Sequence, residues 1–286
     1  REAGLSCAIA SSENINHAWN IVKIHGKWYH IDATWDDPVW DMPGRSYHDY
    51  FLVSFDTMNK NTLINHTKDR TDMVVSAQWG DTYTTAVDTT YESGKFWNGI
   101  EKAIFHKDGY WYSISEGSSK TSFNINKYQY STNINKVLYS GTAKWTTPSG
   151  GYYPGVYSSI YLRGDNLYFT TPDSLNKIDI TSTNVIPTEL INIRTQYNSS
   201  TGNNLYAFGE QYGKLVYFIT DSPNIKKTKD SSNSSKYNKE YAEYTFEMCI
   251  SHKWDAGVVT KEPTYTSTGT KKYTCTNCGE TKIETI

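Results

Sequence analysis

Two residues suited to proton transfer, His17 and Asp32, stand in one alternating stretch at residues 16–38, NHAWNIVKIHGKWYHIDATWDDP. Gly26 predicts a two-residue hairpin turn, because glycine adopts positive φ at no steric cost. Strands joined at this turn set Asp32 opposite Trp19. His17 and Asp32 then become diagonal neighbours on one face, about 7–8 Å apart at the backbone. At that distance a carboxylate can hydrogen-bond an imidazole and prepare it as a general base.

A triad would also need a nucleophile, and the cysteine near this stretch is Cys7. A reactive thiolate is favoured at a helix N-terminus or beside a cation. Cys7 instead lies in residues 5–10, LSCAIA, an apolar run that predicts a strand. Small buried cysteines are commonly structural. We therefore interpret Cys7 as structural.

The other cysteines form a second constellation, Cys249-x2-His252 and Cys275-x2-Cys278, followed by Gly279. Two pairs of ligands at this spacing predict a structural Cys3His zinc site. The alternative is a disulfide among the cysteines, which an oxidising exterior would favour. The histidine at ligand spacing and the small size of the segment favour zinc. No cofactor is expected for catalysis.

Other polar residues of the first stretch are expected to be structural. His30 shares the face of His17 by alternation but lies farther along the strand, so we expect a structural or rim position. Asp36 and Asp37 precede a proline and are expected to cap a turn. The aromatic residues are expected to form core and cleft walls, and they are Trp19, Trp28, Tyr29 and Trp35.

The sequence as a whole predicts a mainly β, multidomain chain. The middle of the chain repeats a strand, a glycine turn and a second aromatic strand around Gly109, Gly164 and Gly213. This pattern predicts propeller-like blades, with a β-sandwich as the alternative. Its aromatic residues could form a carbohydrate- or peptide-binding face or simply pack the sheets. The expected segments are a first domain at 1–70, a linker at 71–95, the β-repeat domain at 96–225, a second linker at 226–240 and a small module at 241–286.

Composition narrows the classes of partner. The net charge is -2 and the pI is about 6.4, so neither nucleic acid nor an anionic membrane is expected as the main partner. No apolar run approaches the ~20 residues that span a bilayer. The chain opens at Arg1, in what looks like a helix end, and we interpret it as a fragment of a longer protein. The missing signal peptide therefore leaves localisation open.

The runs at 16–20 (NHAWN) and 28–38 (WYHIDATWDDP) resemble the transglutaminase-like superfamily, and most of all its bacterial branch. The resemblance spans residues 1–70. It implies a truncated α+β, papain-like domain with catalytic Cys, His and Asp, in which His17 is the base and Asp32 orients it. In that family the nucleophile precedes a helix that ends in a segment like residues 1–4, so the resemblance implies a nucleophile upstream of Arg1.

The final residues, 252–286, resemble a small repeat module of surface proteins of Gram-positive bacteria, and we expect this module to be zinc-ribbon-like. Together the two resemblances imply an extracellular or cell-envelope enzyme that acts on peptide or amide bonds through a cysteine thioester. Its partner would be a protein, a peptide or a cell-wall component, and its chemistry that of a protease, an amidase or a cross-linking acyltransferase. The present chain alone is expected to be inactive. The alternative is a surface binding or adhesion protein that keeps the transglutaminase-like domain as a scaffold and binds through the β repeats.

Overall fold

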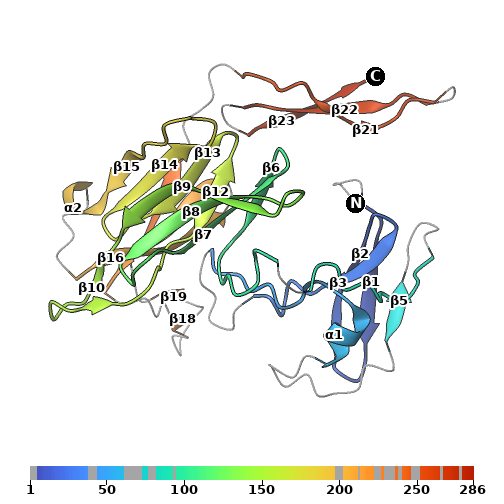
Figure 1. Cartoon of the computed structure of the whole chain (residues 1–286), viewed down its shortest axis with the longest axis horizontal. Coiled ribbons are helices and arrows are strands. Elements are labelled where there is room, and N and C mark those ends of the chain that lie inside the picture. Colours follow the sequence, from blue (N-terminus) through green and yellow to red (C-terminus); the bar gives the residue numbers. More distant parts are fainter. Residues whose placement is uncertain are drawn as a thin grey trace. The chain divides into compact units, whose positions relative to one another are not determined.

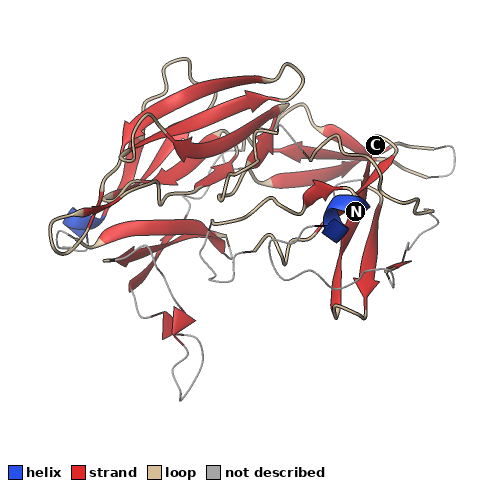
Figure 2. Ribbon diagram, turned by 60° about the horizontal axis from the view of Figure 1, so that its bottom comes forward, coloured by secondary structure: helices blue, strands red, loops and turns tan. Residues whose placement is uncertain are grey.

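The structure is a computed structural model that describes residues 5–37, 44–60, 73–76, 82–92, 95–196, 202–211, 213–221, 227–228, 236–237, 240–245, 252–264, 267–276 and 279–286. These residues form 23 strands and two short helices, so the expectation of a mainly β chain is confirmed (Figures 1 and 2). The chain divides into two compact units. The first is Arg1–Val39 with Ser46–Glu101, and the second is Trp40–Arg45 with Lys102–Ile286. No described helix is long and apolar enough to cross a membrane.

The first unit is built on a five-stranded antiparallel sheet with strand order β4-β3-β2-β1-β5. Its strands are β1 (Cys7–Ser12), β2 (His17–Ile24), β3 (Lys27–Ile31), β4 (Phe51–Val53) and β5 (Val74–Ser76). The β2–β3 hairpin has the predicted register, with Ile24 paired to Lys27. His25 and Gly26 have φ of 50° and 81°, the left-handed pair that a tight hairpin turn needs.

One face of this sheet carries the core of the first unit. The face includes Trp19 and Ile21 of β2 and Trp28 of β3, all nearly inaccessible to solvent. The short helix α1 (Phe55–Lys60) adds Met58 to the same cluster. Alternation along β2 and β3 explains this face, since residues two apart point to the same side. His17 and Asp32 therefore project from the face that the core already organises.

Part of the segment expected as the linker 71–95 belongs to this first unit. Strand β5 pairs with β1, which sets Val75 opposite Ala10. Farther along, Tyr83 packs against the core and Ala86 is buried within it. The apolar residues of this segment occur singly or in short runs such as Met73–Val75. Their burial therefore depends on contacts with distant strands that a local pattern does not reveal.

The second unit contains three larger antiparallel sheets, each with a hairpin predicted from the repeats. The turn glycines Gly109, Gly164 and Gly213 have φ of 79°, 60° and 77°, so a side chain at any of these positions would be strained. The first sheet comprises β6 (Phe105–Lys107), β7 (Tyr110–Glu116), β8 (Ser122–Gln129) and β9 (Ile134–Thr142). The second comprises β12 (Ile160–Arg163), β13 (Asn166–Thr170), β14 (Ser174–Asp179) and β15 (Thr188–Asn192). The third comprises β16 (Asn204–Gln211), β17 (Lys214–Thr220) and β20 (Glu240–Thr245).

The second of these sheets is covered on both faces. On one face Phe169 packs against Phe123 of the first sheet, with ring centroids 5.6 Å apart. On the other face Tyr168 lies 6.4 Å from Tyr244 of the third sheet. Because successive strand residues face opposite sides, this double burial explains the uninterrupted apolar run of β13.

The end of the chain forms a separate small sheet of β21 (Val258–Lys261), β22 (Thr270–Thr274) and β23 (Thr281–Thr285). Residues 240–245 pair with β17 as β20, so most of this strand lies in the segment expected as the small module. The remaining elements are β10 (Trp145–Thr146), β11 (Tyr152–Tyr153), β18 (Lys227–Thr228), β19 (Lys236–Tyr237) and α2 (Ile193–Gln196).

Candidate functional site

The predicted contact between His17 and Asp32 is present in the first unit. His17 Nε2 lies 2.6 Å from Asp32 Oδ2, and the side chains are 13% and 1% exposed. An ionised carboxylate can only accept a hydrogen bond, so the Nε2–H of a neutral His17 donates to Asp32. This arrangement leaves Nδ1 with its lone pair. The pair therefore has the geometry of a base held in one tautomer by a buried carboxylate.

The turn after β3 holds Asp32 in place. Its second oxygen, Oδ1, accepts hydrogen bonds from the backbone amides of Thr34 and Trp35, both at 3.1 Å. An aspartate that bonds to amides two and three residues ahead is typical of a turn that begins where a strand ends. Each carboxylate oxygen thus has a fixed donor, which orients the carboxylate toward His17.

Aromatic rings enclose the imidazole of His17. Trp35 stacks on it with 4.5 Å between ring centroids and 3° between ring planes. Trp19 lies near it at 5.8 Å and 16°. Trp35 in turn meets the edge of Tyr50 at 5.3 Å. These indoles act as walls of the site, as expected from the sequence, and they limit rotation of the His17 ring.

His30 is fully buried in the core behind the pair. The indole Nε1–H of Trp19 donates to His30 Nδ1 at 2.7 Å. Because an indole nitrogen only donates, Nδ1 must accept and cannot carry a proton. Tyr83 adds a longer contact, 3.5 Å, at Nε2. His30 therefore fits the structural role expected for it and steadies Trp19.

The cysteine Cys7 lies away from His17. The β1–β2 register pairs Cys7 with Val22 and Ser12 with His17. Five residues of extended strand separate the two positions, which is about 17 Å. Val22 and His17 also alternate onto opposite faces, so the Cys7 side chain projects from the other side of the sheet. Cys7 cannot reach the His17 ring.

Sequence reasoning did not assign Ser12 to this site and expected Asp36 only to cap a turn. Ser12 pairs directly with His17 and is 3% exposed. Asp36 is 6% exposed and accepts a hydrogen bond from the Tyr50 amide at 2.9 Å, while its own amide donates to Asp32 O at 3.0 Å. Burial, with smaller contributions from the charges of Asp49 and Asp32, raises the pKa of Asp36 to about 7. The sequence around Asp36 indicates only a turn. It does not indicate that Asp36 is buried, because that burial involves Tyr50, 14 residues farther along the chain.

The predicted metal constellation is described only in part. Cys249 and Cys278 lie outside the described residues, whereas His252 and Cys275 lie within them. Cys275 is buried and pairs with Trp254 across an antiparallel bridge. His252 precedes Trp254 by two residues, so alternation sets it on the face of Cys275 as a diagonal neighbour. The described residues contain no group of three metal-ligating side chains.

The turn after Cys275 is closed by backbone hydrogen bonds. Gly279 N donates to Cys275 O at 2.8 Å, and Cys275 N donates to Glu280 O at 2.7 Å. Gly279 has a φ of 75°, which favours glycine at this position. A tight turn of this kind directs backbone amides toward a thiolate, and the donor set of His252 and Cys275 suits zinc.

The two sites differ in how completely they can be described. The His17–Asp32 pair is described at both ends, together with the residues that hold it. Of the four residues expected to bind zinc, the structure describes His252 and Cys275. Comparison with known proteins finds no match to a protein-family model, a curated protein sequence or a solved structure.

Proposed function

We propose that His17 and Asp32 are the general base and the orienting carboxylate of an enzyme that transfers acyl groups from peptide or amide bonds. The observation that carries the proposal is the 2.6 Å contact between His17 Nε2 and the buried Asp32, which reserves Nδ1 for a substrate or nucleophile proton. The sequence resemblance to the transglutaminase-like superfamily points to the same two residues.

The proposed reaction is nucleophilic catalysis by a cysteine. The thiol gives its proton to His17 Nδ1 and its sulfur attacks the amide carbonyl carbon. His17 then passes that proton to the amine as the carbon–nitrogen bond breaks, which leaves a thioester. Water releases the acid in a protease or amidase, and a second amine forms a new amide in a cross-linking enzyme. Asp32 stays ionised and stabilises the imidazolium.

The proposal assigns the nucleophile to a cysteine outside this sequence. Cys7 projects from the opposite face of the sheet, and the resemblance to the transglutaminase-like superfamily implies a nucleophile upstream of Arg1. We infer that the whole protein is secreted or held at a cell surface, where it meets a peptide or cell-wall substrate. The stacked sheets would form propeller-like blades. Cys249, His252, Cys275 and Cys278 would hold a structural zinc ion that stabilises the last segment.

The experiment that tests the base installs a thiol beside it. Ser12→Cys in a Cys7→Ser background places a sulfur directly opposite His17. If His17 and Asp32 form a working base pair, this thiol becomes a thiolate near about pH 6 and reacts with iodoacetamide at least about tenfold faster than with His17→Gln added. Peptide mapping locates the alkylated residue, and the rate with Asp32→Asn added should lie between the two.

Two results would contradict the proposal. Equal alkylation of the Ser12→Cys thiol with and without His17 would mean that the pair does not act as a base. It would favour a binding protein in which the first unit serves as a scaffold. Strong labelling of Cys7 in the native chain by an acyl probe, lost on His17→Ala, would contradict the placement of the nucleophile outside this sequence.

A further inference from the structure

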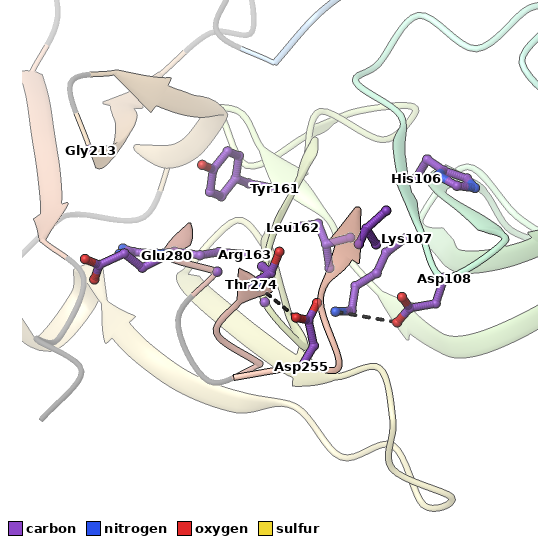
Figure 3. A pocket seen from close by; sticks show the side chains of 13 residues that line it. His106, Lys107, Asp108, Tyr161, Leu162, Arg163, Gly213, Asp255, Thr274 and Glu280 are labelled. Atoms are coloured by element: carbon purple, nitrogen blue, oxygen red, sulfur yellow. Dashed lines mark hydrogen bonds and ion pairs between the residues drawn. The ribbon is translucent and has the colours of Figure 1, made fainter. Parts of the chain in front are cut away.

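A cavity of about 700 Å³ opens in the second unit and is lined by that unit's residues alone (Figure 3). One wall comes from the β6–β7 turn, including Lys107 and Asp108, and another from the end of β12, including Tyr161 and Arg163. The C-terminal segment adds a third wall, which includes Val258 of β21 and Glu280. This volume falls within the range of sites that hold small molecules.

The wall contributed by the C-terminal segment is fixed by backbone contacts. Asp165 N donates to Thr276 O at 3.1 Å. Gly279 approaches Gly164 so closely that a Cβ on Gly279 would lie 2.8 Å from the Gly164 nitrogen. On the same turn Asp165 pairs with Lys107 at 3.1 Å. The cavity is therefore bounded by segments that are joined to one another.

The polar groups in this cavity have fixed directions. Asp255 Oδ1 accepts hydrogen bonds from the amides of Thr274 at 2.9 Å and Gly257 at 3.0 Å, which orients its carboxylate (Figure 3). Lys107 holds Asp108 at 3.5 Å. Burial lowers the pKa of Lys107, but the hydrogen bond and charge of Asp165 outweigh this effect and raise it, so the ammonium stays charged.

The cavity lining carries charges of both signs, with carboxylates from Asp108, Asp255 and Glu280 and cations from Arg163 and Lys107. Lys107 already pairs with Asp108 and Asp165, so the lining offers no concentration of one charge that would select an ion. Carboxylates and guanidinium groups instead suit a neutral ligand that offers both donors and acceptors. Hydroxyl groups provide both.

The same cavity also offers apolar contact. Tyr161 lies in its wall, with its ring held against the edge of Phe105 at 5.5 Å between centroids. Val258 lines it and is 66% exposed. A rigid aromatic ring gives contact area at a low cost in conformational entropy. We propose that this cavity is a binding site for a neutral saccharide, a function separate from that of the His17–Asp32 pair.

The test uses the full chain and two neutral disaccharides, cellobiose and N,N′-diacetylchitobiose. Saturation-transfer difference NMR should detect at least one of them, with a Kd of about 1–10 mM, which corresponds to roughly 3–4 kcal/mol. Val258→Trp fills the cavity from an exposed position and should weaken binding at least about tenfold. Val259→Trp is the matched control, because Val259 alternates to the other face of β21 and does not line the cavity.

A second variant tests the polar contacts without adding bulk. Glu280→Gln keeps the shape of the side chain and should weaken saccharide binding severalfold, whereas Glu284→Gln, outside the cavity on β23, should not. No saturation transfer to either disaccharide at about 20 mM would overturn the proposal, because that concentration exceeds the expected Kd of about 1–10 mM. Equal binding by Val258→Trp and Val259→Trp would overturn it as well. Binding of citrate or a lysine peptide in their place would assign the cavity to an ionic ligand.

Discussion

His17 and Asp32 of the first unit are in direct contact next to the β2–β3 hairpin, whereas His252 and Cys275 of the second unit lie at an isolated antiparallel bridge between Trp254 and Cys275. In both, the histidine stacks on a tryptophan. His17 lies 4.5 Å from Trp35, and His252 lies 4.9 Å from Trp254. In both places antiparallel backbone pairing determines which residues lie near a histidine that stacks on a tryptophan.

The surroundings of the two pairs differ. Asp32 is 1% exposed, and both of its oxygens accept hydrogen bonds. The two amide donors fix the carboxylate, which in turn fixes the orientation of the His17 ring. The His252 side chain is 31% exposed, and its Nε2 lies 3.6 Å from Glu280. A carboxylate fixed by amides favours proton transfer, whereas a buried thiol beside an imidazole favours a metal ion. Strand pairing therefore sets the proximity of the two side chains, and the partner of the histidine decides the chemistry.

Removal of a bound metal ion should produce the largest difference between the two pairs. Chelation should unfold residues 252–286, because binding of a structural zinc ion contributes folding free energy of about 10 kcal/mol. The His17–Asp32 pair should be unaffected. Metal analysis should find about one zinc per chain, lost in Cys275→Ser, and amide spectra should report the loss of structure. A segment that stays folded after chelation but unfolds after reduction would contain a disulfide instead.

Replacing Asp32 should have the next largest effect. Asp32→Ala leaves two backbone amides and the His17 ring without their acceptor, which should cost about 3 kcal/mol in the free energy of unfolding. Asp32→Asn keeps an oxygen for the amides and should cost about 1 kcal/mol. Its amide group would donate to Nε2 and shift the ring proton to Nδ1.

Denaturant unfolding measures the first effect of these Asp32 variants, and nitrogen NMR of the His17 ring measures the second. The second unit supplies the control, since His252 should keep its spectrum in both variants. An unchanged His17 tautomer in Asp32→Asn would mean that the carboxylate does not set the position of the proton.

The sequence predicts the first pair well because its information is local. Gly26 sets the turn, and alternation from that turn sets the register of His17 and Asp32. The position of Ser12 could not be predicted in the same way, because it depends on a longer turn, in which Asn16 N donates to Glu13 O at 3.0 Å. A loop of that length permits several registers, and a shift by one residue would move every side chain to the other face.

Tertiary contacts explain the other gaps between sequence and structure. Glu92 accepts from the Ser54 amide at 2.5 Å and from Thr57 Oγ1 at 2.8 Å, so it caps a helix from 38 residues away along the chain. Asp36 is buried because the Tyr50 amide lies beside it. Neither contact follows from periodicity, since each joins segments whose spacing is set by the folded core. The saccharide cavity is missed for the same reason.

A pH titration should isolate the contribution of Asp36 to the first unit. Burial raises its pKa to about 7 from an ordinary value of 3.8, so the folded chain binds this proton more tightly than the unfolded chain. Stability from this group is therefore present below the ordinary pKa and is lost as pH rises through about 7. The free energy of unfolding of the first unit should fall by about 4 kcal/mol over that range, because each unit of pKa shift corresponds to about 1.4 kcal/mol.

Asp36→Asn should make the stability of the first unit nearly independent of pH over the same range, while still accepting from the Tyr50 amide. Neutralising Asp32 should shift the titration of Asp36 to lower pH, because the Asp32 charge contributes to its raised pKa. A wild-type stability that rises with pH over this range would contradict the protonated state assigned to Asp36.

The smallest expected difference concerns the two stacked tryptophans. Trp35→Leu removes a nearly parallel stack on a mostly buried ring and should cost about 1 kcal/mol, whereas Trp35→Phe keeps an aromatic face and should cost less. Trp254→Leu removes a stack tilted by 21° on a more exposed histidine and should cost about 0.5 kcal/mol. Urea unfolding of each variant measures these costs.

The Trp35 stack limits rotation of the His17 ring, whereas the Asp32 contact sets the position of its proton. Trp35→Leu should therefore leave the tautomer of His17 unchanged while broadening the NMR signals of its ring. A changed tautomer in Trp35→Leu would instead assign control of the proton to the indole, and the distinction between the two pairs would then rest on their aromatic neighbours.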